Sequence, residues 1–245
     1  MKHPFRKKWG QNFLRDPNII RKIIYCLEPD KNDVILEIGP GDGALTNQLH
    51  SQVRHIHAVE IDPLLIKQLS EKQYANVSLY KADILKWDTS CLPEGIKIIS
   101  NLPYYISSLI LFHLLILPDW QKMVLMFQKE VAKRIVSKPG KKSYSRLSVM
   151  CQAYCHVNIE FKITKDVFQP RPDVDSAVLT LIPRDEDLPD ISSFSNFIKQ
   201  AFSQRRKKLK NNLPLAYENG ILDKWADMRP EQLSPSDYIQ LYLRI

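Results

Sequence analysis

The segment Val34-Ile35-Leu36-Glu37-Ile38-Gly39-Pro40-Gly41-Asp42-Gly43 decides the fold that this sequence predicts. Its first half is apolar apart from one glutamate and is rich in β-branched residues, which is typical of a buried strand. The glycines that follow let the backbone take positive φ angles and approach a ligand closely. Residues 44–50 then have a helical pattern, so the segment predicts a strand, a tight turn and a helix at a ligand-binding edge.

The same alternation of strands and helices continues outward from this segment. We expect a mostly parallel sheet covered by helices, an α/β, Rossmann-like architecture, because strands separated by helices form parallel sheets. The last two expected strands have no helix between them and predict an antiparallel pair at one edge. The expected strands are 34–38, 55–61, 77–81, 96–100, 123–127, 157–164 and 177–182, and the expected helices are 44–50, 64–73 and 106–117.

A charged break bounded by proline at 184–189 separates this part from the rest of the chain. We therefore predict an α/β domain at 1–184 and a small helical domain at 185–245. Periodic apolar residues predict three helices in the second domain, and a segment this short is expected to pack on the first domain. These helices are expected at 191–203, 216–225 and 236–243.

The overall charge of the chain favours a polyanionic partner. Among 245 residues there are 35 Lys and Arg against 27 Asp and Glu, for a net charge of +8. Cationic surfaces bind phosphates and release counterions, although the same excess is compatible with a basic protein that has no such partner. The longest apolar stretch, 106–117, is too short to span a bilayer, and no apolar segment follows the cationic N-terminus. We expect a cytoplasmic protein with no membrane segment.

The four cysteines do not have the dense spacing of a disulfide framework. Cys151, Cys155 and His156 could suggest a metal site, but the two cysteines lie within an apolar run and no second ligand pair follows. We interpret Cys151 and Cys155 as buried, small apolar residues and expect no metal.

Two acidic residues at the ends of expected strands predict a nucleoside-containing cofactor. Glu60 ends the second strand, 23 positions after Glu37, where a carboxylate accepts hydrogen bonds from a ribose diol. Asp83 follows the third strand and is placed to accept from an adenine amino group. The turn lacks the glycine spacing of a dinucleotide site, and Asp42 would repel a phosphate. A cationic cofactor without phosphate, such as S-adenosylmethionine, fits better than a dinucleotide, and the alternative is two solvated strand ends.

The motif Asn101-Leu102-Pro103-Tyr104 follows the fourth expected strand. An adenine amino group is a poor nucleophile, and acceptors aimed at its two protons favour its pyramidal, reactive form. The side-chain oxygen of Asn101 and the carbonyl of Leu102 could supply them, with Pro103 fixing the turn. Tyr104 offers an aromatic face for stacking an extruded base, worth about 1–3 kcal/mol. The alternative is an ordinary turn, which the adjacent cofactor signature disfavours.

The sequence resembles the ribosomal RNA adenine dimethyltransferases over nearly its whole length. Several of the shared pieces are general methyltransferase features, but their combination is specific. The resemblance lies in residues 9–14, 37–43, 59–62, 101–104, 128–131, 144–150, 168–178 and 202–207.

The resemblance implies an S-adenosylmethionine-dependent methyltransferase fold and adds roles for individual residues. Asn12 and Leu14 would close over the methionine end of the cofactor, and Phe168 would form the second aromatic wall of the base pocket. One departure is Tyr105, where this family usually has asparagine, and it alters the rim of the pocket. The further cofactor contacts would be Gly39, Glu60, Asp83 and Asn101.

The resemblance also implies the substrate. Members of the family place two methyl groups on each of two adjacent adenosines near the 3′ end of small-subunit rRNA. The expected partner is this RNA in a hairpin loop of a pre-assembled small ribosomal subunit, during ribosome biogenesis, and we expect a monomeric protein.

The densest basic run, Arg205-Arg206-Lys207-Lys208, predicts contacts to RNA phosphates. Two smaller clusters are 6–8 and the lysines at 138, 141 and 142. A charge run is often only a solvated surface, but three clusters on a protein with a base pocket favour contact with RNA, whose loops are recognised by shape and splayed bases.

Three other functions share much of this pattern. An enzyme of the same fold could dimethylate large-subunit rRNA and confer macrolide resistance, but 202–207 and 229–234 resemble the small-subunit group more. A non-catalytic ribosome-assembly factor could keep the fold, although the intact motif residues argue against lost catalysis. DNA adenine methyltransferases more often have proline at the position of Leu102.

Overall fold

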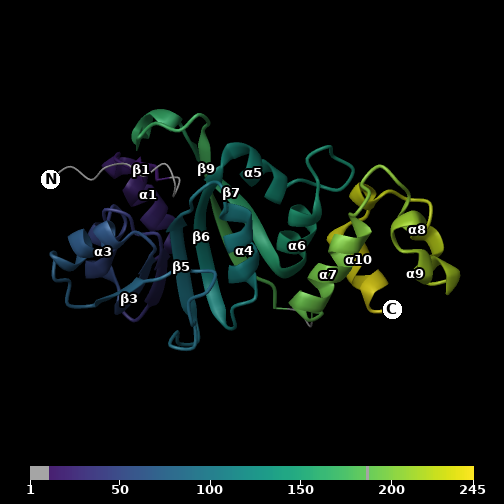
Figure 1. Cartoon of the computed structure of the whole chain (residues 1–245), viewed down its shortest axis with the longest axis horizontal. Coiled ribbons are helices and arrows are strands. Elements are labelled where there is room, and N and C mark those ends of the chain that lie inside the picture. Colours follow the sequence, from purple (N-terminus) through teal and green to yellow (C-terminus); the bar gives the residue numbers. More distant parts are fainter. Residues whose placement is uncertain (1–10, 186–187) are drawn as a thin grey trace. The chain divides into compact units, whose positions relative to one another are not determined.

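A computed structural model of the chain describes residues 11–185 and 188–245 (Figure 1). The chain forms two compact units, an α/β unit of residues 1–132 and 158–182 and a helical unit of residues 133–157 and 183–245. The helical unit thus takes residues 133–157 in addition to the C-terminal residues. The predicted limits of the domains, 1–184 and 185–245, differ from this grouping and stay a prediction.

The α/β unit is built on a seven-stranded sheet with strand order β4-β3-β2-β5-β6-β9-β7. β2 pairs in parallel with β3 and β5, β3 pairs in parallel with β4, and β5 pairs in parallel with β6. β9 runs antiparallel to β6, and β7 lies beside it at the edge. The predicted mostly parallel sheet is confirmed. Its strands are β2 (Val34–Ile38), β3 (His55–Glu60), β4 (Val77–Lys81), β5 (Ile96–Asn101), β6 (Trp120–Gln128), β7 (Cys155–Ile163) and β9 (Ser176–Pro183).

One face of the sheet is covered by α1 (Pro17–Leu27), a helix that the sequence analysis did not predict. It begins at Asp16, whose side chain accepts from the backbone of Asn18 at 2.8 Å, a capping bond that satisfies an otherwise orphan donor. Apolar residues at helical spacing face a core shared with β2, β3, β5 and β6. The buried residues of α1 are Ile20, Ile23, Ile24 and Leu27.

The remaining helices of this unit follow the strands closely. The predicted helix 44–50 is shorter, as α2 (Thr46–Leu49) and a 3-10 turn (His50–Gln52). The other predicted helices are confirmed with slightly different ends. They are α3 (Pro63–Ser70) and α4 (Ser107–Leu115), and α5 (Lys129–Ile135) begins directly after β6.

Two short strands, β1 (Phe13–Leu14) and β8 (Phe168–Gln169), form an antiparallel pair outside the main sheet. Leu14 lies opposite Phe168, and a 3-10 turn (Lys165–Val167) precedes β8. The pair brings the segment before α1 next to a segment more than 150 positions later in the chain. No periodic pattern in the sequence predicts so short a pairing.

The helical unit has an aromatic core. The ring of Phe194 lies 5.8 Å from that of Tyr154 and 5.4 Å from that of Tyr242. Cys151 and Cys155 are buried, as predicted. The elements of this unit are α6 (Arg146–Tyr154), α7 (Ile191–Ala201), α8 (Leu209–Asn212), α9 (Pro214–Glu218), two 3-10 turns (Asp223–Trp225 and Pro230–Gln232) and α10 (Pro235–Tyr242).

The predicted helix 216–225 is wrong as a single helix. It divides into α9 and the 3-10 turn at Asp223–Trp225, because Gly220 takes a φ of +69° and ends the first part.

Among the described residues, no helix combines the length and the apolar character needed to cross a membrane.

Glu37 is a buried carboxylate in the middle of the α/β unit. It lies in β2 with 1% of its surface exposed, and the hydroxyl of Thr46 in α2 donates to its Oε2 at 2.7 Å. Its Oε1 has no hydrogen-bond partner among the described residues. Burial penalises the charged form and raises the pKa of Glu37 from 4.5 to about 7, and the hydrogen bond from Thr46 opposes this only in part.

This burial makes folding stability depend on pH. In the unfolded chain Glu37 releases its proton near pH 4.5, whereas in the folded chain it does so near pH 7. Between these values the folded state binds more protons, so stability falls as pH rises, by up to about 3 kcal/mol. We expect Glu37→Gln to flatten the unfolding free energy between pH 5 and 7.5 relative to wild type, measured by urea denaturation. The same slope in both proteins would contradict the assignment.

Candidate functional site

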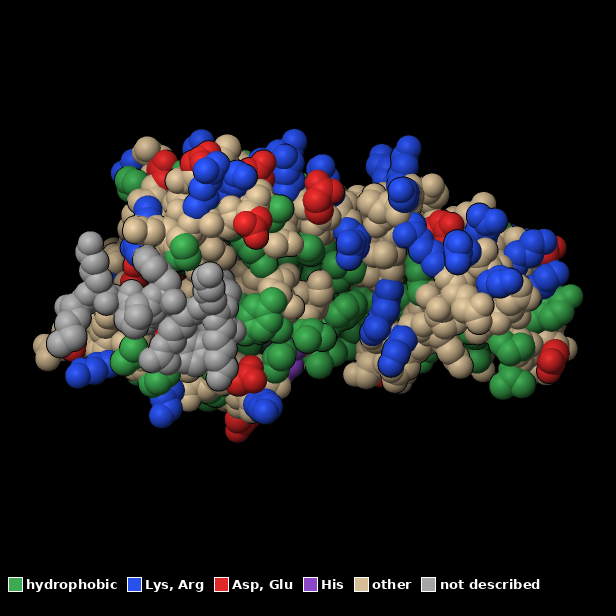
Figure 2. Space-filling model, turned by 45° about the horizontal axis from the view of Figure 1, so that its top comes forward, with side chains coloured by type: hydrophobic (Ala, Val, Ile, Leu, Met, Phe, Trp, Pro, Cys, Tyr) green, Lys and Arg blue, Asp and Glu red, His purple; other side chains and the backbone are tan. Residues whose placement is uncertain are grey.

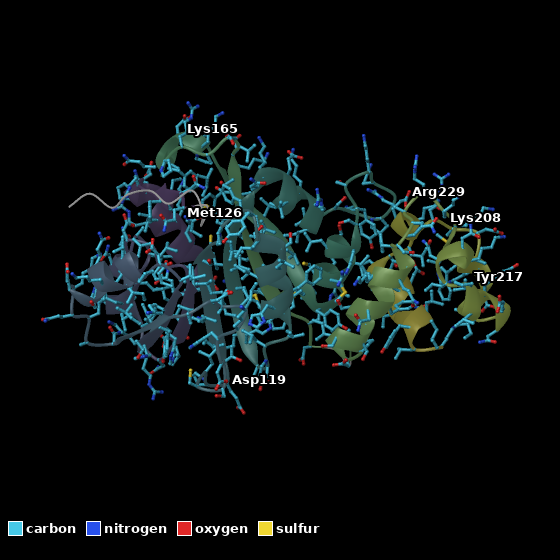
Figure 3. The ribbon with its side chains drawn as sticks, viewed as in Figure 1. Asp119, Met126, Lys165, Lys208, Tyr217 and Arg229 are labelled. Atoms are coloured by element: carbon cyan, nitrogen blue, oxygen red, sulfur yellow. The ribbon has the colours of Figure 1, made fainter. Side chains whose placement is uncertain are left out.

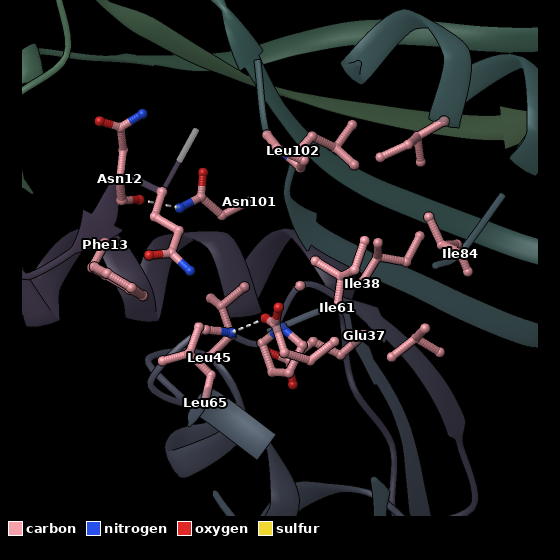
Figure 4. A pocket seen from close by; sticks show the side chains of 18 of the residues that line it. Asn12, Phe13, Glu37, Ile38, Leu45, Ile61, Leu65, Ile84, Asn101 and Leu102 are labelled. Atoms are coloured by element: carbon pink, nitrogen blue, oxygen red, sulfur yellow. Dashed lines mark hydrogen bonds between the residues drawn. The ribbon is translucent and has the colours of Figure 1, made fainter. Parts of the chain in front are cut away.

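A cavity of the α/β unit opens where β2, β3 and β5 end, beside the residues that follow β4 (Figure 4). The carboxyl ends of neighbouring parallel strands meet at this edge, which is where open α/β sheets bind ligands. The sequence-predicted residues that line the cavity are Asn12, Leu14, Gly39, Glu60, Asp83, Asn101, Leu102, Pro103 and Tyr104.

The turn after β2 forms one wall of the cavity. Gly41 has a φ of +61°, and a Cβ there would lie 3.0 Å from the ring of Phe13. Its backbone N–H donates to Oε2 of Glu60 at 3.1 Å. A side chain at this position would therefore strain the backbone and push Phe13 away from the cavity. Asp42 also lines this wall and forms an ion pair with Arg15.

Glu60 ties the turns after β2 and β3 together. Besides the bond from Gly41, its Oε1 accepts from the backbone N–H of Asp62 at 2.8 Å. The side chain is 6% exposed, and burial raises the pKa of Glu60, opposed by these backbone hydrogen bonds. A carboxylate offers about four acceptor sites, so the carboxylate keeps acceptor capacity for a ligand beside these backbone bonds.

Asp83 lies beyond the end of β4 on the next part of the wall. Its Oδ1 accepts from the backbone N–H of Leu85 at 3.1 Å, which fixes the side chain at the start of a turn. Ile84 and Ile61 add apolar surface to the same cavity. The combination of a carboxylate and apolar side chains suits a flat, polar-edged ring such as a nucleobase.

The segment before α1 closes the cavity from the opposite side. The Asn101 side-chain nitrogen donates to the carbonyl of Asn12 at 2.8 Å (Figure 4). Gln11 also lines the cavity, and its side-chain nitrogen donates to Oδ2 of Asp62 at 2.9 Å. Gln11 had no predicted role, although it lies within the segment 9–14 that carries the family resemblance.

The 101–104 turn leaves β5 at the cavity. The bond to Asn12 uses the nitrogen of Asn101 and leaves its side-chain oxygen to accept. The Tyr104 hydroxyl is hydrogen-bonded to the hydroxyl of Ser176 in β9, and burial raises the pKa of Tyr104. Ser176 was not predicted as a site residue, because nothing in the sequence shows that β9 returns beside this turn.

Among the predicted cofactor-binding and catalytic residues, all of which are described, Phe168 alone does not line the cavity. It is 4% exposed in the hydrophobic core and pairs with Leu14, which does line the cavity. Its role as a second aromatic wall stays a prediction. Tyr105, by contrast, lines the cavity and is 60% exposed, so the departure from the family's asparagine lies at the rim.

The predicted phosphate-binding run belongs to the helical unit, where 205–208 connects α7 to α8. Arg206, Lys207 and Lys208 are exposed, whereas Arg205 is half-buried. Lys208 forms an ion pair with Asp227 at 2.9 Å. The basic cluster at 6–8 lies outside the described residues.

Comparisons with known proteins find relatives that match this chain over nearly its whole length. A family model described as ribosomal RNA adenine dimethylase matches residues 2–245. A relative named ribosomal RNA small subunit methyltransferase A from Francisella tularensis subsp. novicida is 42% identical, over 96% of this chain and 95% of that protein. A relative with the same name from Herminiimonas arsenicoxydans is 38% identical over 100% of both chains.

Two solved structures extend the likeness to three dimensions. A dimethyladenosine transferase from Plasmodium falciparum has a TM-score of 0.84 and 28% identity, over 94% of this chain and 96% of that chain. The 23S rRNA methyltransferase ErmE has a TM-score of 0.74 and 27% identity, over 95% of this chain and 99% of that chain. With a family model that spans the chain and full-length relatives near 40% identity, the chain belongs to the ribosomal RNA adenine dimethylase family.

Proposed function

We propose that this protein is an S-adenosylmethionine-dependent enzyme that dimethylates the 6-amino groups of two adjacent adenosines near the 3′ end of small-subunit rRNA. One observation carries the proposal. A single cavity is lined both by the acidic strand ends, Glu60 and Asp83, and by the turn from Asn101 to Tyr104. The names of the full-length relatives favour the small subunit as the source of the RNA.

The donor groups of the cavity fit S-adenosylmethionine. Glu37, Glu60 and Asp83 all line it, and an acidic, partly apolar cavity favours a cation and disfavours a phosphate. In this proposal Glu60 accepts from the ribose hydroxyls, Asp83 from the adenine amino group, and Gly39, Asn12, Leu14 and Asn101 surround the methionine end. The bound cofactor supplies a methyl group on a positively charged sulfur.

The 101–104 turn positions the target base. The Asn101 side-chain oxygen and the Leu102 carbonyl accept from the two protons of the adenine amino group, which favours its nucleophilic form. Pro103 fixes the turn, and the bond from Tyr104 to Ser176 holds an aromatic face on which the base stacks. The amine loses its proton to solvent after methyl transfer, so the site needs no strong base. Phe168 is proposed as the second wall.

The proposed substrate is RNA held in a pre-assembled small ribosomal subunit. The basic residues of the helical unit support this, since phosphate contacts position a nucleic acid without reading its sequence. The protein would act as a monomer in the cytoplasm, without a metal ion. Extruding a base costs a few kcal/mol, and less from a loop, so a hairpin loop is the preferred target.

The nucleoside product tests this function directly. We expect purified protein, labelled S-adenosylmethionine and unmethylated small subunits to yield dimethyladenosine at two adjacent 3′-end positions after digestion of the RNA. The structural likeness to ErmE makes the large subunit the matched alternative. Label only in large-subunit RNA would instead indicate the resistance-type reaction, and label in neither would favour an assembly factor.

Substitution of Glu60 tests the cofactor assignment. We expect Glu60→Ala to weaken S-adenosylmethionine binding by tenfold or more in calorimetry, because each hydrogen bond to a charged group contributes about 1.5–3 kcal/mol. Glu71→Ala is the control, since Glu71 is an exposed carboxylate of the same unit that is not among the described residues lining the cavity. Equal affinity of the Glu60 variant and wild type would remove this residue from the site.

The role of the 101–104 turn in holding the target base is tested by the rate of methyl transfer in variants of Asn101 and Tyr104. We expect Asn101→Ala to lower the single-turnover rate constant at saturating S-adenosylmethionine by about 100-fold, because the amine loses an oriented acceptor. Tyr104→Phe keeps the stacking face and loses only the bond to Ser176, so its effect should be far smaller than that of Tyr104→Ala. Single-turnover methylation of unmethylated small subunits measures both, and similar losses for the two Tyr104 variants would exclude stacking as the main role.

A further inference from the structure

A lysine-rich loop of the helical unit is held in a defined conformation. This basic loop, Ser137–Ser143, carries Lys138, Lys141 and Lys142, all exposed. The hydroxyls of its two end residues are hydrogen-bonded at 2.7 Å. Gly140 has a φ of +79°, and its N–H donates to the carbonyl of Glu231 at 2.6 Å.

Arg205 binds the backbone of this same loop. Its guanidinium donates to the carbonyl of Lys142 at 2.6 Å and to that of Lys141 at 3.4 Å. Its Nε lies 3.9 Å from the carboxylate of Glu231. The backbone carbonyl of the same residue accepts the hydrogen bond from the N–H of Gly140. One guanidinium therefore joins the basic loop to the 3-10 turn at Pro230–Gln232, and these contacts use the face that a phosphate would need.

The neighbouring cations differ from Arg205 in their surroundings. Arg206 and Lys207 are exposed, while Lys208 and Lys210 both pair with Asp227, at 2.9 and 3.0 Å. The backbone N–H of Leu209 donates to the carbonyl of Met228, so Lys208 and Arg229 lie on adjoining segments (Figure 3). Lys and Arg side chains crowd the part of the helical unit drawn at the right of Figure 2.

We propose that Arg205 is a positioning residue, which presents the three lysines of the basic loop to RNA phosphates beside Arg206 and Lys207. The inference rests on the proposed function, because it takes RNA as the partner. It replaces the prediction that Arg205 itself binds phosphate. Without Arg205 the loop carbonyls lose their common donor, the half-buried Glu231 carboxylate loses its cation, and the lysines spread over many conformations.

Hydrogen exchange of the full chain without RNA tests the first step. We expect the amides of 137–143 to exchange about tenfold faster in Arg205→Gln, because a hydrogen bond to a charged group is lost. Arg205→Lys keeps the charge but not the planar fork, so it should behave in the same way. Arg206→Gln is the matched control and should leave the exchange of the loop unchanged. Unchanged exchange in both Arg205 variants would overturn the proposal.

Binding to unmethylated small ribosomal subunits at several KCl concentrations, with Mg²⁺ fixed, tests the second step. We expect Arg206→Gln to reduce the salt slope by about one unit, as for one lost phosphate contact. Arg205→Gln should weaken binding in the wild-type background, but have little further effect once Lys138, Lys141 and Lys142 are replaced by glutamine. Such non-additivity identifies residues that act through one another.

The outcomes separate this inference from the proposed function. An equal loss from Arg205→Gln in both backgrounds, with Arg205→Lys close to wild type, would show a direct phosphate contact and overturn the positioning role. Wild-type binding by the triple lysine variant would remove the basic loop from the RNA surface and also overturn the inference. Neither result touches the methylation proposal, which the nucleoside product decides independently.

Discussion

The buried carboxylate of Glu60 is the interaction on which the geometry of the cavity depends. It receives N–H groups from the turn after β2 and from the loop after β3, so two turns that the sheet only brings near each other become one wall. A carboxylate this buried is costly unless hydrogen bonds compensate its charge. Backbone N–H groups of Gly41 and Asp62 supply such bonds. The acceptor sites that remain on the carboxylate oxygens are available to a ligand that donates hydrogen bonds.

The parallel sheet could be predicted from the sequence because short β-rich segments alternate with helical segments along this part of the chain. β2 and β4 were predicted with their observed ends, and β3 and β5 to within one residue. The cavity followed from the same logic, since strand ends at one edge place Glu60, Asp83 and Asn101 together. Periodicity and topology therefore sufficed wherever a residue belonged to the regular part of the sheet.

What could not be predicted depends on pairing between distant segments. The β1–β8 pair is two residues long, so it has no periodicity, yet it places Asn12 against Asn101. Ser176 reaches Tyr104 because β9 returns antiparallel beside β6, and the sequence gives no register for that return. The grouping of residues 133–157 with the C-terminal helices is likewise a matter of packing, decided by apolar surfaces of α6 that meet α7 and α10.

Opposite charges line the cavity of the α/β unit and the surface of the helical unit. The cavity of the α/β unit has carboxylates at its strand ends, which suits a cationic cofactor. The surface of the helical unit is cationic, yet a count of its Lys and Arg residues overstates the charge presented to RNA. Asp227 forms ion pairs with Lys208 and Lys210. The guanidinium of Arg205 donates to backbone carbonyls and lies beside the carboxylate of Glu231. Arg205 is half-buried whereas Arg206 and Lys207 are exposed, and the proposed division between a positioning cation and phosphate-binding cations rests on this difference, which the sequence alone does not show.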